Sequence, residues 1–182
     1  MSASGPATDG ILAPAKINLN LKIVGRREDG YHLLDSMVVF TAFGDRILVQ
    51  PSPQDSITID GPFGDMLNEP PSENICAKAL TMFRLAGGRV GPLAIHIRKD
   101  IPVGAGLGGG SSNAAALLRW LQENADGAVP DVSLSEIAPS LGADVPACLA
   151  GRALQMTGIG ETITLMSIAP HGRILLASPR VF

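Results

Sequence analysis

The sequence predicts an α+β fold in which helices cover one face of a mixed β-sheet. Strand-like segments fill residues 11–60 and helical apolar spacing begins near residue 72, after which the two types alternate without the regular order of a βαβ protein. The chain has 182 residues, of which 46% are apolar, and its mean hydropathy is positive. These values are sufficient for a folded protein with one good core.

The amino-terminal segment predicts strands separated by turns. Apolar and polar residues alternate over residues 17–23, which is typical of a half-buried strand and places Lys16 and Asn18 on one face. The pairs Asp29-Gly30 and Gly44-Asp45 predict turns. Further strands are therefore expected over residues 33–40, 46–50 and 56–60.

A loop and a helix follow. Residues 61–71 are rich in proline and glycine and predict a loop. Ser72 is the expected N-cap of a helix that ends at Gly87-Gly88, and residues 93–99 predict the next strand. The apolar face of the helix consists of Ile75, Ala79, Met82 and Phe83.

A glycine-rich loop comes directly after this strand. Its five glycines are Gly104, Gly106, Gly108, Gly109 and Gly110, and the N-cap residues Ser111, Ser112 and Asn113 then lead into a helix expected over residues 113–124. Unpaired N–H groups and the positive end of the helix dipole attract anions at a helix N-terminus. The segment therefore predicts a phosphate-binding site.

Other interpretations of the loop fit less well. A flexible linker is disfavoured because apolar strand and helix residues flank the loop. The chain contains no Gly-Lys pair, which excludes a Walker-type loop. The glycine spacing does match a dinucleotide-binding motif, but Glu123, the expected ribose-binding acid, lies on the helix rather than after a second strand.

The carboxyl-terminal third predicts two short helices and a hairpin. Ser133 and Glu136 form a capping box, and Pro139 is expected to end or kink the helix that follows. Asp144 stands at an N-cap position, with Pro146 in the first turn of the next helix. We expect a hairpin of residues 153–157 and 162–166, and a last strand over residues 173–177.

Charge and cysteine content exclude several classes of function. Lys and Arg number 14 against 17 Asp and Glu, and the net charge of -3 without a basic run excludes a nucleic-acid surface. Cys76 and Cys148 are too far apart for a zinc site and predict small core residues in a reducing compartment. Residues 1–10 lack the features of a signal peptide and predict a loose tail. With no apolar stretch of about 20 residues, we expect a soluble, cytoplasmic protein.

Four stretches, in this order along the chain, resemble the GHMP small-molecule kinases. They start at Pro14, Gly25, Pro102 and Leu141 and read PAKINLNL, GRREDGYH, PVGAGLGGGSSNAA and LGADVP. The glycine stretch alone would indicate only the superfamily. The Gly-Tyr-His and Gly-Ala-Asp-Val-Pro segments narrow the resemblance to members that phosphorylate a cytidine-diphosphate-linked sugar alcohol in the non-mevalonate isoprenoid pathway.

This resemblance implies a domain organisation. Residues 11–170 would form the ribosomal-protein-S5-like, ATP-binding N-terminal domain of the family. Residues 171–182 would begin a ferredoxin-like C-terminal domain that is otherwise absent, together with its second glycine-rich loop and one aromatic wall of the cytosine pocket. The surface left by that domain would allow self-association.

The resemblance also implies roles for individual residues. Lys16 and Asp144 would be the catalytic pair, while Asn18, Tyr31 and His32 would contact the small-molecule substrate, with Tyr31 stacking on cytosine. ATP and Mg²⁺ would be the cofactors, and Ser111 could also help to hold the metal. The residues implied in ATP binding are Pro102, Val103, Gly104, Ala105, Gly106, Leu107, Gly108, Gly109, Gly110, Ser111 and Ser112, with Asn74 and Lys99 on the adenine side.

Each assignment has an ordinary structural alternative. Asp144 could serve only as an N-cap, Lys16 as a solvated strand residue, and Tyr31 and His32 as surface side chains. Pro139 leaves the placement of Asp144 open. The chain could also be a GHMP kinase for mevalonate or homoserine, or a nucleotide-binding module without turnover.

Overall fold

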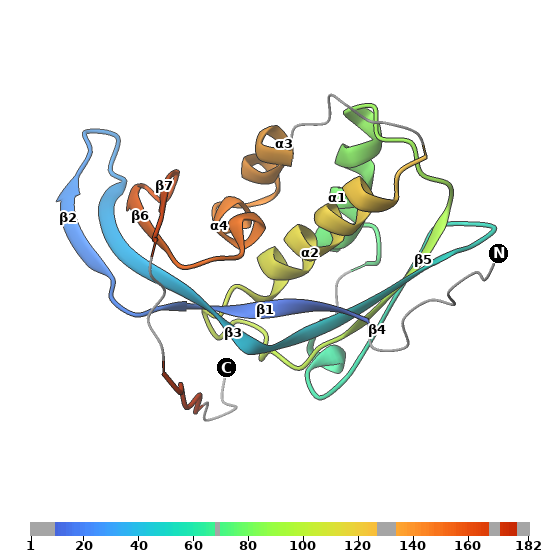
Figure 1. Cartoon of the computed structure of the whole chain (residues 1–182), viewed down its shortest axis with the longest axis horizontal. Coiled ribbons are helices and arrows are strands. Elements are labelled where there is room, and N and C mark those ends of the chain that lie inside the picture. The colour runs from blue at the N-terminus through green and yellow to red at the C-terminus, as the bar shows by residue number, and fades with distance from the viewer. Residues whose placement is uncertain (1–9, 68–69, 127–133, 168–171, 178–182) are drawn as a thin grey trace.

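The computed structural model describes residues 10–67, 70–126, 134–167 and 172–177. Seven strands in these ranges form one mixed sheet, and the α-helices lie over one of its faces (Figure 1). The predicted α+β class is therefore confirmed. The strands are β1 (Ile11–Asn18), β2 (Lys22–Arg26), β3 (His32–Pro51), β4 (Ser56–Asp60), β5 (Leu93–Arg98), β6 (Leu154–Gly158) and β7 (Thr162–Leu165). The helices are α1 (Ile75–Leu85), α2 (Gly109–Asn124), α3 (Leu134–Leu141) and α4 (Val145–Ala150), with a short 3₁₀ turn at Gly64–Met66.

Strand β3 is the centre of the sheet. It pairs in antiparallel fashion with β1, β2, β5 and β6, and its register joins Val39 to Ile17 and Ile47 to Ile97. Strands β4 and β5 are parallel, which makes the sheet mixed, and β7 pairs with β6 as the predicted hairpin. Strands from both halves of the chain are thus held by one long element.

The core lies between the sheet and the helices. Ile47 and Ile95 from the sheet meet Phe83 of α1 and Leu117 of α2, and all four side chains are buried. Burying a side chain of this size stabilises the fold by about 1.5–3 kcal/mol. Ala79 and Phe83 are buried on the predicted apolar face of α1, so the helical spacing identified this core surface correctly.

The predicted single strand over residues 17–23 is wrong. Strand β1 ends at Asn18 and β2 begins at Lys22. Between them the side-chain Oδ1 of Asn20 accepts the backbone N–H of Met37 at 2.5 Å, and therefore occupies a place that a strand carbonyl would take. Ile17 is half-buried, but the later apolar residues of the alternation, Leu19, Leu21 and Ile23, are exposed, with Leu21 at 58%.

The predicted turn at Gly44-Asp45 is also wrong, because β3 continues without a break for 20 residues. A Cβ at Gly44 would lie 2.2 Å from the carbonyl oxygen of Ala13 on the paired strand β1, so glycine is needed there for close strand approach. Asp45 is fully buried and accepts hydrogen bonds from Lys99 Nζ and from the backbone N–H groups of Asp100 and Ile101. Gly44 and Asp45 therefore make contacts with distant segments, β1 and the residues that follow β5, and do not form a turn.

Two helix starts differ from the prediction. The N-cap of α1 is Asn74, whose Oδ1 accepts the N–H of Cys76 at 2.9 Å, rather than Ser72. Helix α2 begins at Gly109 instead of Asn113, with Gly108 in the left-handed conformation as its N-cap. The last glycines of the loop therefore form the first turn of α2.

The carboxyl-terminal expectations have mixed outcomes. Pro139 lies inside α3, which ends two residues later at Leu141, and α4 follows Asp144 as predicted. Residues 172–177 have no secondary structure, so the predicted last strand is wrong. Ser133 and most of the predicted tail lie outside the described residues.

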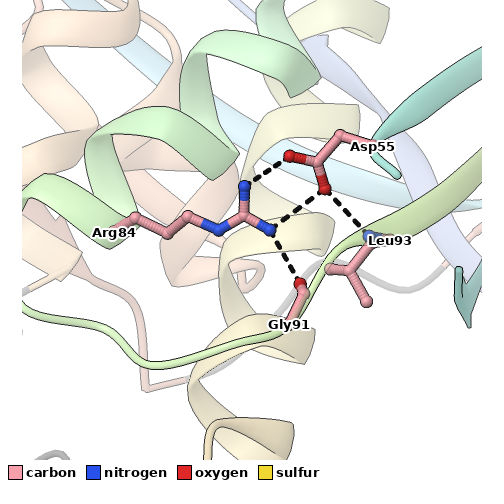
Figure 2. A network of polar contacts seen from close by, with 4 residues as sticks. All are labelled: Asp55, Arg84, Gly91 and Leu93. Carbon is pink, nitrogen blue, oxygen red and sulfur yellow. Dashed lines mark hydrogen bonds and ion pairs between the residues drawn. The ribbon is translucent and has the colours of Figure 1, made fainter. Parts of the chain in front are cut away.

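A network at one end of the sheet fixes α1 against β5 (Figure 2). The guanidinium of Arg84 donates to both carboxylate oxygens of Asp55, at 2.5 and 3.0 Å, and to the carbonyl of Gly91 at 2.7 Å. The N–H of Leu93 donates to Asp55 Oδ1 at 2.8 Å. Since Asp55 precedes β4 and Leu93 opens β5, this network joins a helix to two strands.

Candidate active site

A lysine and an aspartate from opposite ends of the chain meet above the sheet. Lys16 on β1 is only 4% exposed, and its Nζ lies 3.4 Å from Oδ1 of Asp144. The same Nζ donates to Oδ1 of Asn18 at 2.8 Å, so Lys16 and Asn18 do share a face. Lys16 is therefore a buried, paired ammonium and not a solvated strand residue.

Asp144 occupies the N-cap position of α4, yet its side chain makes no capping hydrogen bond. Its carboxylate faces Lys16 instead, and 38% of the side chain remains exposed. An ion pair that is buried on one side and accessible on the other can meet a bound hydroxyl group. The short helix that follows fixes the backbone of Asp144, because Arg119 of α2 donates to the last carbonyl groups of α4, those of Cys148 and Leu149, at 2.9 and 3.0 Å.

The glycine loop lines a cleft of about 480 Å³ beside this pair. The carbonyl of Leu107 accepts the backbone N–H of Lys16 at 2.8 Å, which attaches the loop to β1. A Cβ at Gly108 would lie 3.1 Å from the Cβ of Lys16, so the loop packs directly on this side chain. The cleft is lined by every residue from Pro102 to Ser111, and by Leu67, Glu73, Asn74, Ile75, Lys78, Lys99, Asn113 and Leu141.

The electrostatics of the cleft favour an anion. The first N–H groups of a helix have no intrahelical partner, and those of α2 belong to Gly109, Gly110 and Ser111, which line the cleft. The positive end of the helix dipole lies at the same place. Lys78 and Lys99 add positive charge to the lining, opposed by Glu73.

Asn74 and Lys99, assigned by resemblance to the adenine side, both line the cleft. Each also has a structural contact: Asn74 caps α1, and the buried Lys99 forms an ion pair with the fully buried Asp45. Because Asp45 also accepts the N–H groups at the entrance to the glycine loop, this pair fixes the loop where it leaves β5.

The remaining predicted residues lie elsewhere. Ser112 is buried behind the loop, and its N–H donates to the carbonyl of Gly108 within α2. Tyr31 and His32 follow the predicted turn between β2 and β3, are exposed, and do not line the cleft. Tyr31 is 61% exposed, and its backbone N–H donates to Asp29 Oδ1 at 3.3 Å.

Several residues of the site are not evident from the sequence. Lys78 could have been found, because it lies four residues after Asn74 and thus on the same helix face. Ser36, whose Oγ accepts Asn18 Nδ2 at 2.6 Å, and Arg119 act through contacts between distant segments, and their local sequence gives no signal.

Both cysteines are buried, as predicted. Burial raises the pKa of Cys148, on α4, to about 12, with a further contribution from nearby Asp144. Its thiol is therefore neutral and unreactive at physiological pH.

No group of three His, Cys, Asp or Glu side chains in residues 10–67, 70–126, 134–167 and 172–177 is placed to hold a metal ion. None of the helices in that part of the chain is long and apolar enough to cross a membrane.

Comparison with known proteins identifies similar sequences and folds. Residues 74–152 match the family described as GHMP kinases N terminal domain. Over 172 residues the chain is 46% identical to the 4-diphosphocytidyl-2-C-methyl-D-erythritol kinase of Agrobacterium fabrum, covering 92% of this chain and 58% of that protein. The kinase of the same name from Paramagnetospirillum magneticum is 43% identical over 171 residues, covering 94% and 59%. The chain thus spans somewhat more than half the length of these relatives.

Solved structures agree with this similarity. A crystal structure of 4-(cytidine 5'-diphospho)-2C-methyl-D-erythritol kinase superposes with a TM-score of 0.70 at 39% identity, covering 87% of this chain and 55% of that one. The phosphomevalonate kinase of Streptococcus pneumoniae gives a TM-score of 0.53 at 13% identity, covering 80% and 46%. The latter likeness is one of fold alone.

Proposed function

We propose that this chain, whose residues 74–152 match the family described as GHMP kinases N terminal domain, takes part in ATP-dependent phosphorylation of the 2-hydroxyl group of 4-diphosphocytidyl-2-C-methyl-D-erythritol. The product belongs to non-mevalonate isoprenoid precursor biosynthesis. One observation carries the proposal: the backbone of Lys16 is bonded to the glycine loop while its side chain is paired with Asp144. A phosphate-binding loop and an acid–amine pair are thereby held next to each other.

The geometry suits phosphoryl transfer. That reaction requires mainly that an alcohol be aligned with the γ-phosphate and that charge on the transferred group be neutralised. In our proposal the N–H groups of the loop bind the phosphates of ATP, and Asp144 accepts a hydrogen bond from the substrate hydroxyl and orients it. Lys16 holds Asp144 in place and stabilises negative charge on the reacting oxygens.

Substrate recognition is assigned to the hairpin of β2 and β3. We propose that Tyr31 stacks on cytosine and that His32 forms a hydrogen bond with the base. Stacking of a base on an aromatic ring contributes about 1–3 kcal/mol to binding. The exposure of Tyr31 leaves its ring accessible for this contact. Asn18, two residues after Lys16 and on the same face, would contact the acceptor part of the substrate.

Mg²⁺ fits the oxygen donors present. This ion binds in kinases through one or two protein oxygens together with waters and substrate phosphates, so it needs no cluster of carboxylates. Ser111, which lines the cleft, is the residue whose side chain would help to hold it. When bound, the ion would neutralise phosphate charge. The cytoplasmic location and self-association expected from the sequence stay predictions.

An ADP-release assay tests the proposal. We expect turnover with the diphosphocytidyl substrate and none with mevalonate or homoserine, and the variants Lys16→Met and Asp144→Asn should lose activity by about 10²–10⁴-fold. Both variants should keep the circular dichroism spectrum of the parent. Turnover of mevalonate or homoserine would instead select another GHMP kinase, and nucleotide binding without any turnover would select the non-catalytic module.

A further inference from the structure

A directed chain of hydrogen bonds leads away from Lys16 beneath the site. Lys16 Nζ donates to Asn18 Oδ1 at 2.8 Å, and Asn18 Nδ2 donates to Ser36 Oγ at 2.6 Å. Ser36 Oγ in turn donates to the backbone carbonyl of Asn20 at 2.6 Å. Four residues from β1, the β1–β2 connection and β3 are thereby joined in one line.

The direction of this chain is fixed by chemistry. An ammonium group has only donors, so Asn18 must present its oxygen to Lys16 and its NH₂ group to the other side. The hydroxyl of Ser36 has a single proton, and the carbonyl of Asn20 can only accept, so that proton goes to Asn20. The oxygen of Ser36 is then free to accept the Asn18 amide. Rotating this amide by half a turn would place its NH₂ against the ammonium of Lys16.

Ser36 is well suited to enforce this orientation. It has no exposed surface, and on β3 its backbone is paired with Met156 of β6, in the interior of the sheet. Water therefore cannot easily replace its hydroxyl, and a buried polar group that loses its partner is costly.

We propose that Ser36 is a positioning residue: it orients the Asn18 amide, and through that amide it holds the Lys16 ammonium beside Asp144. An ammonium has three N–H groups. Asn18 accepts a hydrogen bond from one of them and Asp144 lies 3.4 Å from the nitrogen as its ion-pair partner, so the ammonium can still donate to an oxygen of the bound ligand. This inference rests on the proposed kinase function, because its consequence for turnover exists only if Lys16 serves phosphoryl transfer.

The test compares substitutions of Ser36 that differ in hydrogen bonding. Ser36→Ala should lower kcat about 10–100-fold, as expected when a group supporting a reactive centre is removed, with the KM for ATP unchanged. Ser36→Thr keeps the hydroxyl and should restore most of kcat. Ser36→Cys keeps the approximate volume with a much weaker donor and acceptor, so it should resemble Ser36→Ala. Ser140→Ala is the matched control, because it removes another hydroxyl bonded to a backbone carbonyl, that of Ile137, on α3.

A second measurement does not need turnover. Hydrogen exchange of the Asn18 side-chain amide, followed by NMR, should become about tenfold faster in Ser36→Ala and Ser36→Cys, and should be unchanged in Ser36→Thr and Ser140→Ala. If the parent chain shows no kinase activity, the proposed function fails while this exchange still decides whether Ser36 holds the amide.

Two results would overturn the inference. One is unchanged Asn18 exchange in both hydroxyl-free variants. The other is a loss of kcat in Ser36→Ala that accompanies an equal rise in the KM for ATP, since this would indicate general damage to the cleft. Should Ser36→Ala fail to fold, kcat and the Asn18 exchange rate of Ser36→Cys are compared with those of Ser36→Thr, and this comparison tests the inference in the same way.

Discussion

Gly108 must be glycine for two separate reasons. Its φ of +65° lies in the left-handed region, which costs a residue with a Cβ roughly 1–2 kcal/mol. A Cβ would also lie 3.1 Å from Cβ and 3.2 Å from Cε of Lys16, closer than ordinary contacts. The loop therefore has a direct influence on the position of the Lys16 side chain.

Gly106 provides the control for a mutational test of this contact. It has a similar φ of +71°, but nothing lies within 4 Å of the position that its Cβ would occupy. We expect both Gly106→Ala and Gly108→Ala to be destabilised by about 1–2 kcal/mol through backbone strain. Only Gly108→Ala should in addition lower kcat strongly, because it displaces Lys16. Equal kcat values for the two variants would contradict this role of Gly108.

Residues of the site differ in how far the sequence can locate them. The glycine loop is a stretch whose composition is informative by itself, whereas Lys16 and Asp144 were assigned by resemblance alone. Ser36 and Asp45 each stand beside another polar residue, Asp35 and Arg46, in a mainly apolar strand, and their partners, Asn18 and Lys99, come from other strands or loops. Only the paired sheet shows what they bind.

At the level of elements, local patterns were reliable where the pattern reflects core packing. The apolar spacing of α1 and the strand before the glycine loop were predicted closely, because these residues are buried in the main core. The alternation over residues 17–23 is misleading beyond Asn18, because Leu19, Leu21 and Ile23 are exposed. The sequence around Gly44-Asp45 predicts a turn. The residues that explain the pair, Ala13 beside Gly44 and Lys99 beside Asp45, are both remote in sequence.

The Asp55–Arg84 network makes stability depend on pH. The hydrogen bonds from Arg84, together with that from the Leu93 backbone, hold the pKa of Asp55 below its usual value and outweigh the opposing effect of burial. The folded state therefore binds this proton less readily than the unfolded state. The stabilisation is present above the unfolded pKa, near 4, and is lost as the pH falls through the folded pKa.

Arg84→Met tests this network. Asp55 is 45% exposed, so after allowing for solvent screening we expect a loss of about 1 kcal/mol in the free energy of unfolding at pH 7. The difference from the parent should shrink below about pH 4, towards the smaller, pH-independent part that comes from the hydrogen bond of Arg84 to the Gly91 carbonyl. Urea denaturation at a series of pH values measures this difference in the free energy of unfolding.

Arg98→Met is the control. It removes a single contact to Asp100 at 3.3 Å and should change stability by less than about 0.5 kcal/mol. A difference for Arg84→Met that is as large in strong acid as at pH 7 would contradict the assignment.

For the whole molecule, nucleotide binding and phosphoryl transfer should be separable. The cleft is lined by the glycine loop and α1, whereas Lys16 and Asp144 do not line it. We expect Mg-ATP at about one hundred times its Kd to raise Tm by about 5–10 °C. Lys16→Met and Asp144→Asn should keep most of this shift despite their loss of turnover. Loss of the shift in both variants would place the nucleotide on the acid–amine pair instead of in the cleft.

The fold class was predictable because it depends on the order of strand and helix signals, which short-range errors do not change. Both false predictions in the first 60 residues concerned where strands begin and end, and the sheet remained mixed with helices on one face (Figure 1). The domain division at residue 170 came from resemblance and stays a prediction.

Because β3 is a single strand of 20 residues, it fixes the position of one end of the site relative to the other. Its first half carries His32 and Ser36, beside the proposed substrate hairpin, and its second half carries Asp45, which anchors the entrance to the glycine loop. At about 3.3 Å per residue, the nine-residue interval from Ser36 to Asp45 has a length of roughly 30 Å along the strand, and this length sets the separation of the two ends. Inserting or deleting one residue within it would turn one end over relative to the other, whereas a change of length in a surrounding loop would leave the two ends in register.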